Sequence, residues 1–225
     1  VNSDKQEKIA FDLDGVFTAS WSPNGEKLAF VGNEGGASDI YTYEISSKKT
    51  KNLTNDVFSD TEPSWSPDGE KIIFVSDRGV MSNGIKTTAK DMIDHNYEQS
   101  DIFIIDLNSK NINQITNTGY NENYPIFSNT ENKLFYTGDY QGTWNLFRYD
   151  LDSGKSEPIT NLLTGLFQLS LTKDDGSLVF SGYSSLGWDV YRLSNPLTSK
   201  STIIEPTNYI VNREENDKEE LVDLR

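Results

Sequence analysis

The acidic side chains are the residues of this sequence most able to do chemistry, and they gather in segments rich in turn-forming residues. Those that matter here are Asp12, Asp14, Asp56, Asp60, Glu62 and Glu122. Carboxylates on loops can attract a basic partner, and together with backbone carbonyls they can hold Ca²⁺. We take Asp12, Asp14 and Asp60 as the candidate Ca²⁺ ligands and expect no other cofactor.

The composition excludes several kinds of chemistry. The 225 residues include no Cys and one His, His95, so thiolate catalysis and multi-histidine metal centres are ruled out. A formal net charge of −15 argues against nucleic-acid binding, which needs a basic face. No apolar stretch is long enough to span a membrane. A Ser–His–Asp triad would have to use His95, and no Gly-x-Ser-x-Gly elbow is present. We therefore predict no catalytic residues, although a carboxylate pair acting on a glycoside stays open.

An internal repeat organises the chain. Residues 19–27 (ASWSPNGEK) recur as residues 63–71 (PSWSPDGEK), and two more divergent copies follow. The anchor positions are Trp21, Trp65, Phe127 and Leu171. The repeat period is 44 residues, with one 18-residue insertion between Val75 and Asp101. Such a period indicates stacked supersecondary units. We expect Trp21 and Trp65 to be core residues.

Each repeat is expected to form four short strands. The anchor segment is followed by a Pro-Asp-Gly type turn and a second strand such as residues 71–75. Third strands are predicted at residues 39–43, 101–105, 145–149 and 189–193, and fourth strands end at residues 54, 116 and 160. Four strands in 40 to 45 residues indicate a blade of an all-β propeller, here with four visible four-stranded blades.

The motif at residues 64–79 (SWSPDGEKIIFVSDRG), followed by residues 100–103 (SDIF) and 115–116 (IT), resembles the TolB-type (WD40-like) β-propeller repeat. The resemblance covers roughly residues 8–206. It implies a propeller of the kind found in periplasmic TolB proteins, in bacterial envelope proteins, and as an accessory domain of prolyl-oligopeptidase- or tricorn-like peptidases.

The repeat spacing also predicts the domain boundaries. Residues 1–13 are expected to hold the outer strand of a preceding or closing blade, formed by residues 7–11. The four blades span about 14–54, 55–116, 117–160 and 161–206, with residues 201–204 as the last strand. Residues 207–225 form an acidic tail or linker. Either these blades belong to a larger propeller of six to eight blades, or the four close on themselves with the N-terminal strand on the last blade.

Loops that join successive blades gather on one face of a propeller, where binding residues usually lie. We predict partner contacts at Asp56, Phe58, Asp60, Glu62, Tyr97, Tyr120, Glu122, Trp144 and Trp188. The 18-residue insertion lies on the same face and contains His95 and Tyr97.

The leading hypothesis is a non-catalytic protein- or ligand-binding scaffold of a bacterial envelope or secreted protein, in the periplasm or outside the cell. Its partner would be a protein or peptide, of basic character, and further blades or domains of the same polypeptide could also pack against it. The alternatives are the substrate-gating propeller of a peptidase and a carbohydrate-binding or carbohydrate-active propeller.

Overall fold

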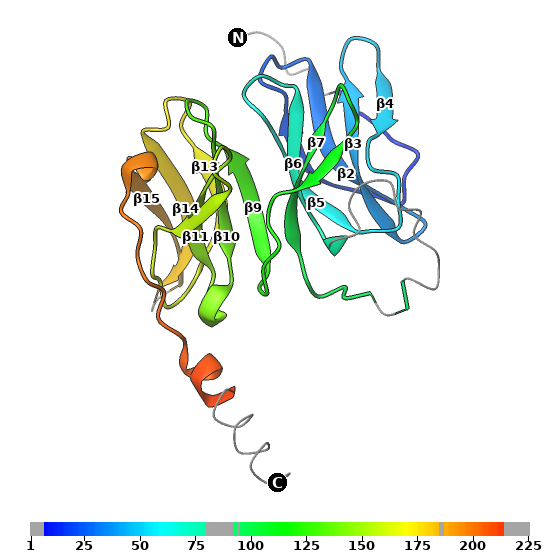
Figure 1. The fold of residues 1–225 in the computed structure, drawn as a ribbon. Helices are drawn as coiled ribbons and strands as arrows, with labels where there is room; N and C mark the ends of the chain where they lie inside the picture. Colours follow the sequence, from blue (N-terminus) through cyan, green and yellow to red (C-terminus); the bar gives the residue numbers. More distant parts are fainter. Residues whose placement is uncertain (1–6, 80–91, 94, 185–186, 214–225) are drawn as a thin grey trace.

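The computed structural model describes residues 7–79, 92–93, 95–184 and 187–213 (Figure 1). Its first sheet consists of β1 (Gly15–Trp21), β2 (Lys27–Glu34), β3 (Ala37–Glu44) and β4 (Lys49–Asn52). Its second consists of β5 (Asp60–Trp65), β6 (Lys71–Ser76), β7 (Asp101–Asp106) and β8 (Ile112–Gln114). All pairings are antiparallel between strands adjacent in sequence.

The remaining strands repeat this plan. The third sheet consists of β9 (Glu122–Phe127), β10 (Lys133–Gly138), β11 (Asn145–Asp150) and β12 (Lys155–Pro158). The fourth consists of β13 (Leu166–Leu171), β14 (Ser177–Ser184) and β15 (Gly187–Ser194). The short 3₁₀ helices η2 (Tyr140–Gly142) and η3 (Pro196–Thr198) follow β10 and β15, and residues 208–213 are helical.

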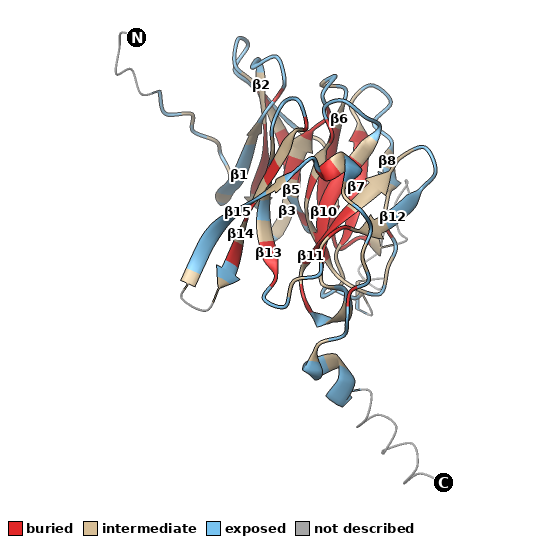
Figure 2. Ribbon diagram, turned by 90° about the vertical axis from the view of Figure 1, so that its left-hand side faces the viewer, coloured by how far each residue is buried: buried red, intermediate tan, exposed pale blue. Residues whose placement is uncertain are grey.

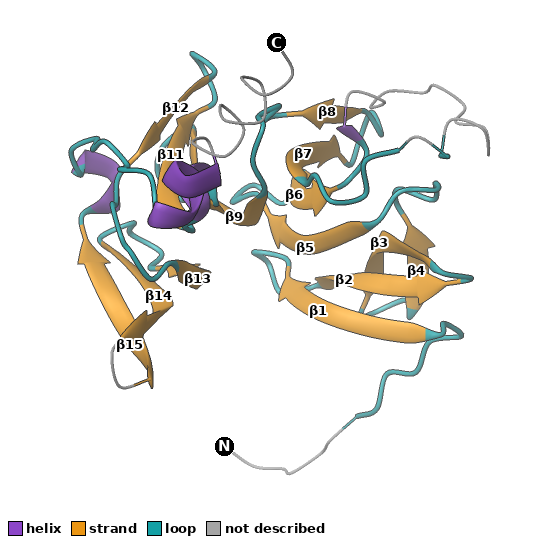
Figure 3. Ribbon diagram, turned by 90° about the horizontal axis from the view of Figure 1, so that it is seen from below, coloured by secondary structure: helices purple, strands orange, loops and turns teal. Residues whose placement is uncertain are grey.

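The four sheets stand side by side as blades, with their first strands β1, β5, β9 and β13 toward a common centre (Figure 3). Contacts between β1 and β5, β5 and β9, and β9 and β13 join each blade to the next. The all-β fold and the four-blade propeller organisation are therefore confirmed.

The turn after each anchor explains the repeated Ser-Pro-Asp-Gly sequence. The Ser66 hydroxyl donates a hydrogen bond to Asp68 at 2.5 Å and accepts one from the backbone N–H of Lys71 at 2.9 Å. Gly69 has a φ of 73°, a left-handed conformation that favours glycine. The same contacts recur in the first blade, where the Ser22 hydroxyl donates to Asn24 and accepts from the backbone N–H of Lys27. These turns fix the register of the first two strands of each blade.

Three of the four buried apolar clusters lie between neighbouring blades. Ile40, Ile102 and Leu146 occupy the same repeat position and are each 0% exposed, because the following blade covers them. Val190 occupies that position in the fourth blade and is 80% exposed. β15 is accordingly exposed along most of its length in Figure 2.

The first blade, at the other end of the row of four, shows the same dependence of burial on a neighbouring blade. Trp65 is 7% exposed, and its indole N–H donates to the backbone carbonyl of Ser20 in the preceding blade at 3.1 Å. The prediction that Trp65 is a core residue is confirmed. The same prediction for Trp21 is wrong: Trp21 is 60% exposed, because no described blade lies on that side of it.

Two predicted strands are not formed. Residues 7–11 make no strand, and instead Ile9, Phe11 and Leu13 pack on the face of Phe30 and Tyr41. Their alternate spacing presents one apolar side of an extended segment, so they cover the core of the first blade without pairing with a sheet edge.

Residues 201–204 do not complete the fourth blade, which has three strands in the described part of the chain. The backbone N–H of Thr202 donates instead to the carbonyl of Pro158 in β12, at 2.9 Å. Ile204 is buried in the cluster of Leu134, Tyr136 and Phe147, between the second and third blades. The segment therefore returns to the third blade, where a free edge and an apolar site both accept it.

Candidate functional site

The four inner strands carry the same unusual feature at the same repeat position. It is a residue other than glycine with a positive φ, three positions before each anchor: Thr18 (39°), Glu62 (55°), Tyr124 (54°) and Gln168 (59°). At each of these points the pairing register with the second strand shifts, as in a β-bulge. A bulge re-aims a side chain, and such a conformation costs roughly 1–3 kcal/mol where it is strained.

All four of these bulge residues line one cavity of about 480 Å³ at the centre of the arc. Its other lining residues are Ser20, Pro63, Ser64, Pro125, Ile126 and Leu169. A second cavity of about 400 Å³ adjoins it, shares Tyr124 and Gln168, and adds Phe167, Ser181 and Trp188. The four inner strands thus bring together side chains that are 44 to 150 residues apart in the sequence. We call the two cavities together the central site.

Glu62 is the ionisable carboxyl group of the central site. Burial raises its pKa to about 7, and a hydrogen bond donated by the backbone N–H of Tyr124 only partly opposes this. Among the described residues, no cationic side chain forms an ion pair with Glu62. Within the described residues the cavity therefore holds a carboxyl group without a counterion, and burial brings its pKa close to neutral pH.

Aromatic rings lie along the fourth-blade side of the central site. The rings of Trp144 and Phe167 are 6.4 Å apart, those of Phe167 and Trp188 are 5.5 Å apart, and those of Tyr183 and Trp188 are 5.6 Å apart. Trp188 is largely exposed and Trp144 is partly buried. The two tryptophans predicted as ligand contacts are thus linked through Phe167, and Trp188 also contacts Tyr183.

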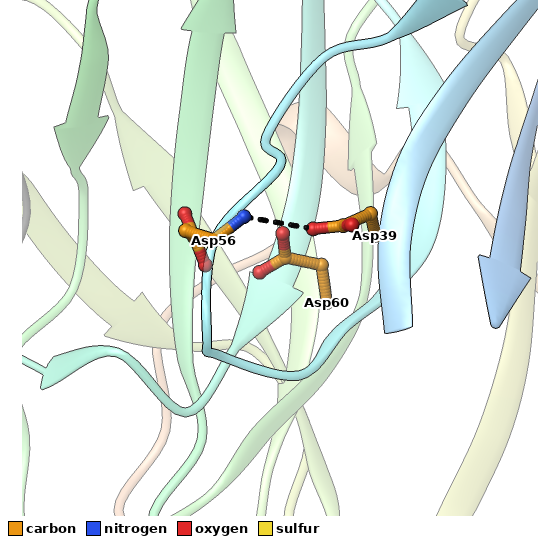
Figure 4. A group of neighbouring side chains, drawn as sticks. All are labelled: Asp39, Asp56 and Asp60. Carbon is orange, nitrogen blue, oxygen red and sulfur yellow. Dashed lines mark hydrogen bonds between the residues drawn. The ribbon is translucent and has the colours of Figure 1, made fainter. Parts of the chain in front are cut away.

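A second group of acidic residues lies where the first and second blades meet (Figure 4). The carboxylates of Asp39, Asp56 and Asp60 come within 4.8 Å of one another. Arg78 bridges two of them, with its guanidinium donating to Asp56 at 2.8 Å and to Asp60 at 2.5 Å.

The Arg78 guanidinium is itself buried and lies over three aromatic rings. Its carbon is 5.4 Å from the ring centre of Phe58, 5.3 Å from Phe74 and 5.5 Å from Phe103. Burial raises the pKa of Asp60 to about 6, although Arg78 opposes this shift. Because this buried ion network joins separate segments of the chain, we assign it a structural role rather than a binding role.

A related pair of carboxyl groups, with no arginine ion pair among the described residues, lies where the second and third blades meet. Asp101 and Glu122 take the repeat positions of Asp39 and Asp60, and both are buried. The hydroxyls of Thr116 and Thr118 donate to Glu122 at 2.7 and 2.8 Å. Burial nevertheless raises the pKa of Glu122 to about 8, and the neighbouring Asp101 adds to the shift. Burial and the neighbouring Asp101 thus favour the neutral form of Glu122, whereas Asp60 has the Arg78 guanidinium as its counterion.

His95 lies at the end of the 18-residue insertion, of which residues 80–91 and 94 are outside the described residues. Its imidazole is 3.7 Å from Asp77, and its ring packs against Phe58 at 5.4 Å and Tyr97 at 4.7 Å. The insertion therefore returns to the second blade through an aromatic contact.

The predicted partner-contact residues fall into three groups by burial. Tyr97 and Trp188 are exposed; Asp56, Glu62, Tyr120 and Trp144 are partly buried; Phe58, Asp60 and Glu122 are buried. Of the predicted Ca²⁺ ligands, Asp60 lies in the carboxylate group with Asp39 and Asp56, whereas Asp14 accepts a hydrogen bond from the backbone N–H of Gly35 at 2.9 Å. Sequence reasoning missed Thr18, Tyr124 and Gln168, although their fixed offset from the anchors was visible.

Part of the sequence is similar to known proteins. The sequence model of the family described as "TolB beta propeller domain" matches residues 1–91. The Tol-Pal system protein TolB of Ruthia magnifica is 43% identical over 53 residues, which are 23% of this chain and 12% of that protein. No helix in the described part of the chain has the length and apolar character needed to cross a bilayer.

Solved structures share the fold. TolB from Acinetobacter baumannii aligns with a TM-score of 0.63 at 20% identity, over 86% of this chain and 44% of that one. A puromycin-hydrolysing peptidase of Mycobacterium tuberculosis aligns with a TM-score of 0.62 at 14% identity, over 87% of this chain and 29% of that one. The chain thus spans less than half the length of either structure, and identities this low show the fold alone. Residues 1–91 thus match the TolB-type β-propeller domain, and the solved structures show the propeller fold over most of the chain.

Proposed function

We propose that this chain is a non-catalytic binding scaffold within a TolB-like β-propeller protein of the bacterial envelope, located in the periplasm or outside the cell. Its partner is a protein or peptide that enters the central site from the face on which the blade-joining loops lie. The similarity to a protein named for the Tol-Pal system supports a role in protein–protein contact.

The observation that carries this proposal is the set of four bulge residues, Thr18, Glu62, Tyr124 and Gln168. Each blade keeps a backbone conformation that L-residues rarely adopt, and each time the side chain concerned lines the same cavity. Such conformations persist where the surrounding structure over-determines them, and they cluster at binding sites.

The surroundings of the central site suit a peptide. Phe167 and Trp188 supply apolar area, and Gln168 and Ser181 supply hydrogen-bonding groups. Sites that bind extended ligands combine an apolar lining with a few such polar groups. The net charge of −15 would speed association with a basic partner.

The uncovered face of the fourth blade supports a second contact. Because the positions equivalent to Val190 are fully buried in the other three blades, we expect a further blade to pack on this face. The exposed Trp21 would be covered in the same way at the opposite end.

A selection from a random peptide library on the immobilised chain tests the binding role. We expect selected peptides to lose affinity at least tenfold for Tyr124→Ala, which truncates a side chain shared by both cavities. The control is Pro67→Ala, which lies beside a different cavity at the opposite end of the blades. Peptides that bind both variants as tightly as the parent chain would contradict the proposed site, and a selection that enriches no peptide would contradict the binding role.

A further inference from the structure

Glu62 and Asp60 lie two residues apart on β5, and they differ in whether a described cation pairs with them. Asp60 is wholly buried and has Arg78 as its counterion at 2.5 Å. Glu62 lines the central cavity, and the described residues offer it no cation. A carboxyl group held in a partly desolvated cavity without a counterion gains most from a ligand that brings a positive charge.

The hydrogen bonding of Glu62 narrows the class of cation. Its Oε2 already accepts the backbone N–H of Tyr124, so Oε1 is the oxygen left to a ligand. A guanidinium is best satisfied by a carboxylate that offers both oxygens, whereas an ammonium group acts as a point charge and needs only one. The geometry thus favours a lysine-type ammonium group over arginine.

The walls of the cavity suit the rest of such a side chain. Tyr124 lies on the next inner strand and contributes to both cavities, and Pro63 and Pro125 add apolar lining. A lysine buries its methylene stem along apolar surface while its charged end meets a polar group. An aromatic face near the ammonium adds a cation–π attraction.

We propose that the central site binds a lysine side chain of the peptide or protein partner, with its ammonium group on Glu62 and its methylene stem against Tyr124. This inference rests on the proposed binding role and adds the chemistry of one subsite. The raised pKa of Glu62 agrees with it, since a bound ammonium would stabilise the ionised carboxylate.

Titration of the chain with Nα-acetyl-lysine methylamide, followed by NMR, tests the proposal. Nα-acetyl-norleucine methylamide is the matched probe because it keeps the methylene stem and lacks the ammonium group. We expect the lysine probe to bind at least tenfold more tightly than the norleucine probe at pH 8, where Glu62 is ionised. Glu62→Gln should abolish that preference.

Glu70→Gln is the control variant, since it removes the same charge from an exposed turn at the opposite end of the blades. It should change the affinity for the lysine probe less than twofold. Both variants are first checked for the parent's circular dichroism and unfolding midpoint. Equal binding of the two probes, an unchanged lysine preference in Glu62→Gln, or tighter binding of the arginine analogue would overturn the proposal. Selected peptides that bind in a Tyr124-dependent manner with no lysine preference would refute this subsite and leave the binding role standing.

Discussion

Two tryptophans at the same repeat position offer a matched test of how the blades stabilise one another. Trp65 and Trp21 both end the first strand of a blade and precede the same Ser-Pro turn. A described blade covers Trp65 and none covers Trp21, so their exposed fractions are 7% and 60%. Replacing each with Ala therefore separates the contribution of the contact between blades from that of residue type.

The expected difference follows from the buried areas. A tryptophan can bury up to about 250 Å², so the two exposed fractions correspond to roughly 230 and 100 Å² removed from solvent. At about 25 cal/mol per Å², the difference is about 3 kcal/mol. Trp65→Ala also leaves the Ser20 carbonyl without its indole donor, which adds about 1 kcal/mol. We expect a loss of about 5 kcal/mol for Trp65→Ala and about 1 kcal/mol for Trp21→Ala, a difference of about 4 kcal/mol.

Urea unfolding followed by far-ultraviolet circular dichroism measures both losses, because it does not depend on tryptophan emission. The slope of the transition should be the same in the two variants, so that midpoints can be compared directly. Equal losses within about 0.5 kcal/mol, or a loss below about 1 kcal/mol for Trp65→Ala, would refute the account of stacking between blades.

Three further predictions follow from the buried charges and the uncovered face. Arg78→Met leaves Asp60 buried without its counterion and should cost about 3–5 kcal/mol in urea unfolding, while a loss below about 1 kcal/mol would show that the bridge is dispensable. Burial raises the pKa of Glu122 from 4.5 to about 8, so between these pH values the folded state binds a proton that the unfolded state has lost. The free energy of unfolding should therefore fall as the pH rises from 4.5 to 8, and Glu122→Gln should make this fall shallower. An identical pH profile in the variant would contradict the raised pKa. Since the chain has no Cys, the thiol of Val190→Cys should react with a maleimide as fast as a free thiol. A slower reaction in this chain would contradict the exposure of β15. An unchanged reaction rate in a longer polypeptide would contradict packing by a further blade.

The repeat spacing predicted the strands well because their cause is local. The Ser66 and Ser22 turns depend on residues within the same short segment, so the sequence motif and the structure agree. The third strands also appear where expected, since their alternating apolar residues must face two neighbouring blades.

The features that sequence reasoning missed depend on distant parts of the chain. The burial of Trp65 and the exposure of Trp21 are set by whether a blade stands on one side, which a local motif does not encode. Residues 201–204 have a strand-like sequence, but the free edge at Pro158 and the site filled by Ile204 lie in another blade.

The central site was only partly predictable for the same reason. Glu62 was expected from its acidic character, and Trp188 from its place at the start of a third strand. Tyr124 and Gln168 gave no chemical signal, because a positive φ favours glycine and nothing in their residue type indicates one. Their role became visible only when the four inner strands were seen to meet.

The proposal that partners enter the central site is tested most directly by the indole N–H signals of the four tryptophans. These lie at separate places: Trp188 lines the central site, Trp144 neighbours it through Phe167, Trp65 lies between two blades, and Trp21 lies at the far end of the arc. Titration with a selected peptide should shift the Trp188 signal and leave the Trp65 and Trp21 signals in place. A shift confined to Trp21 or Trp65, or a bound peptide that leaves Trp188 unchanged, would contradict the account.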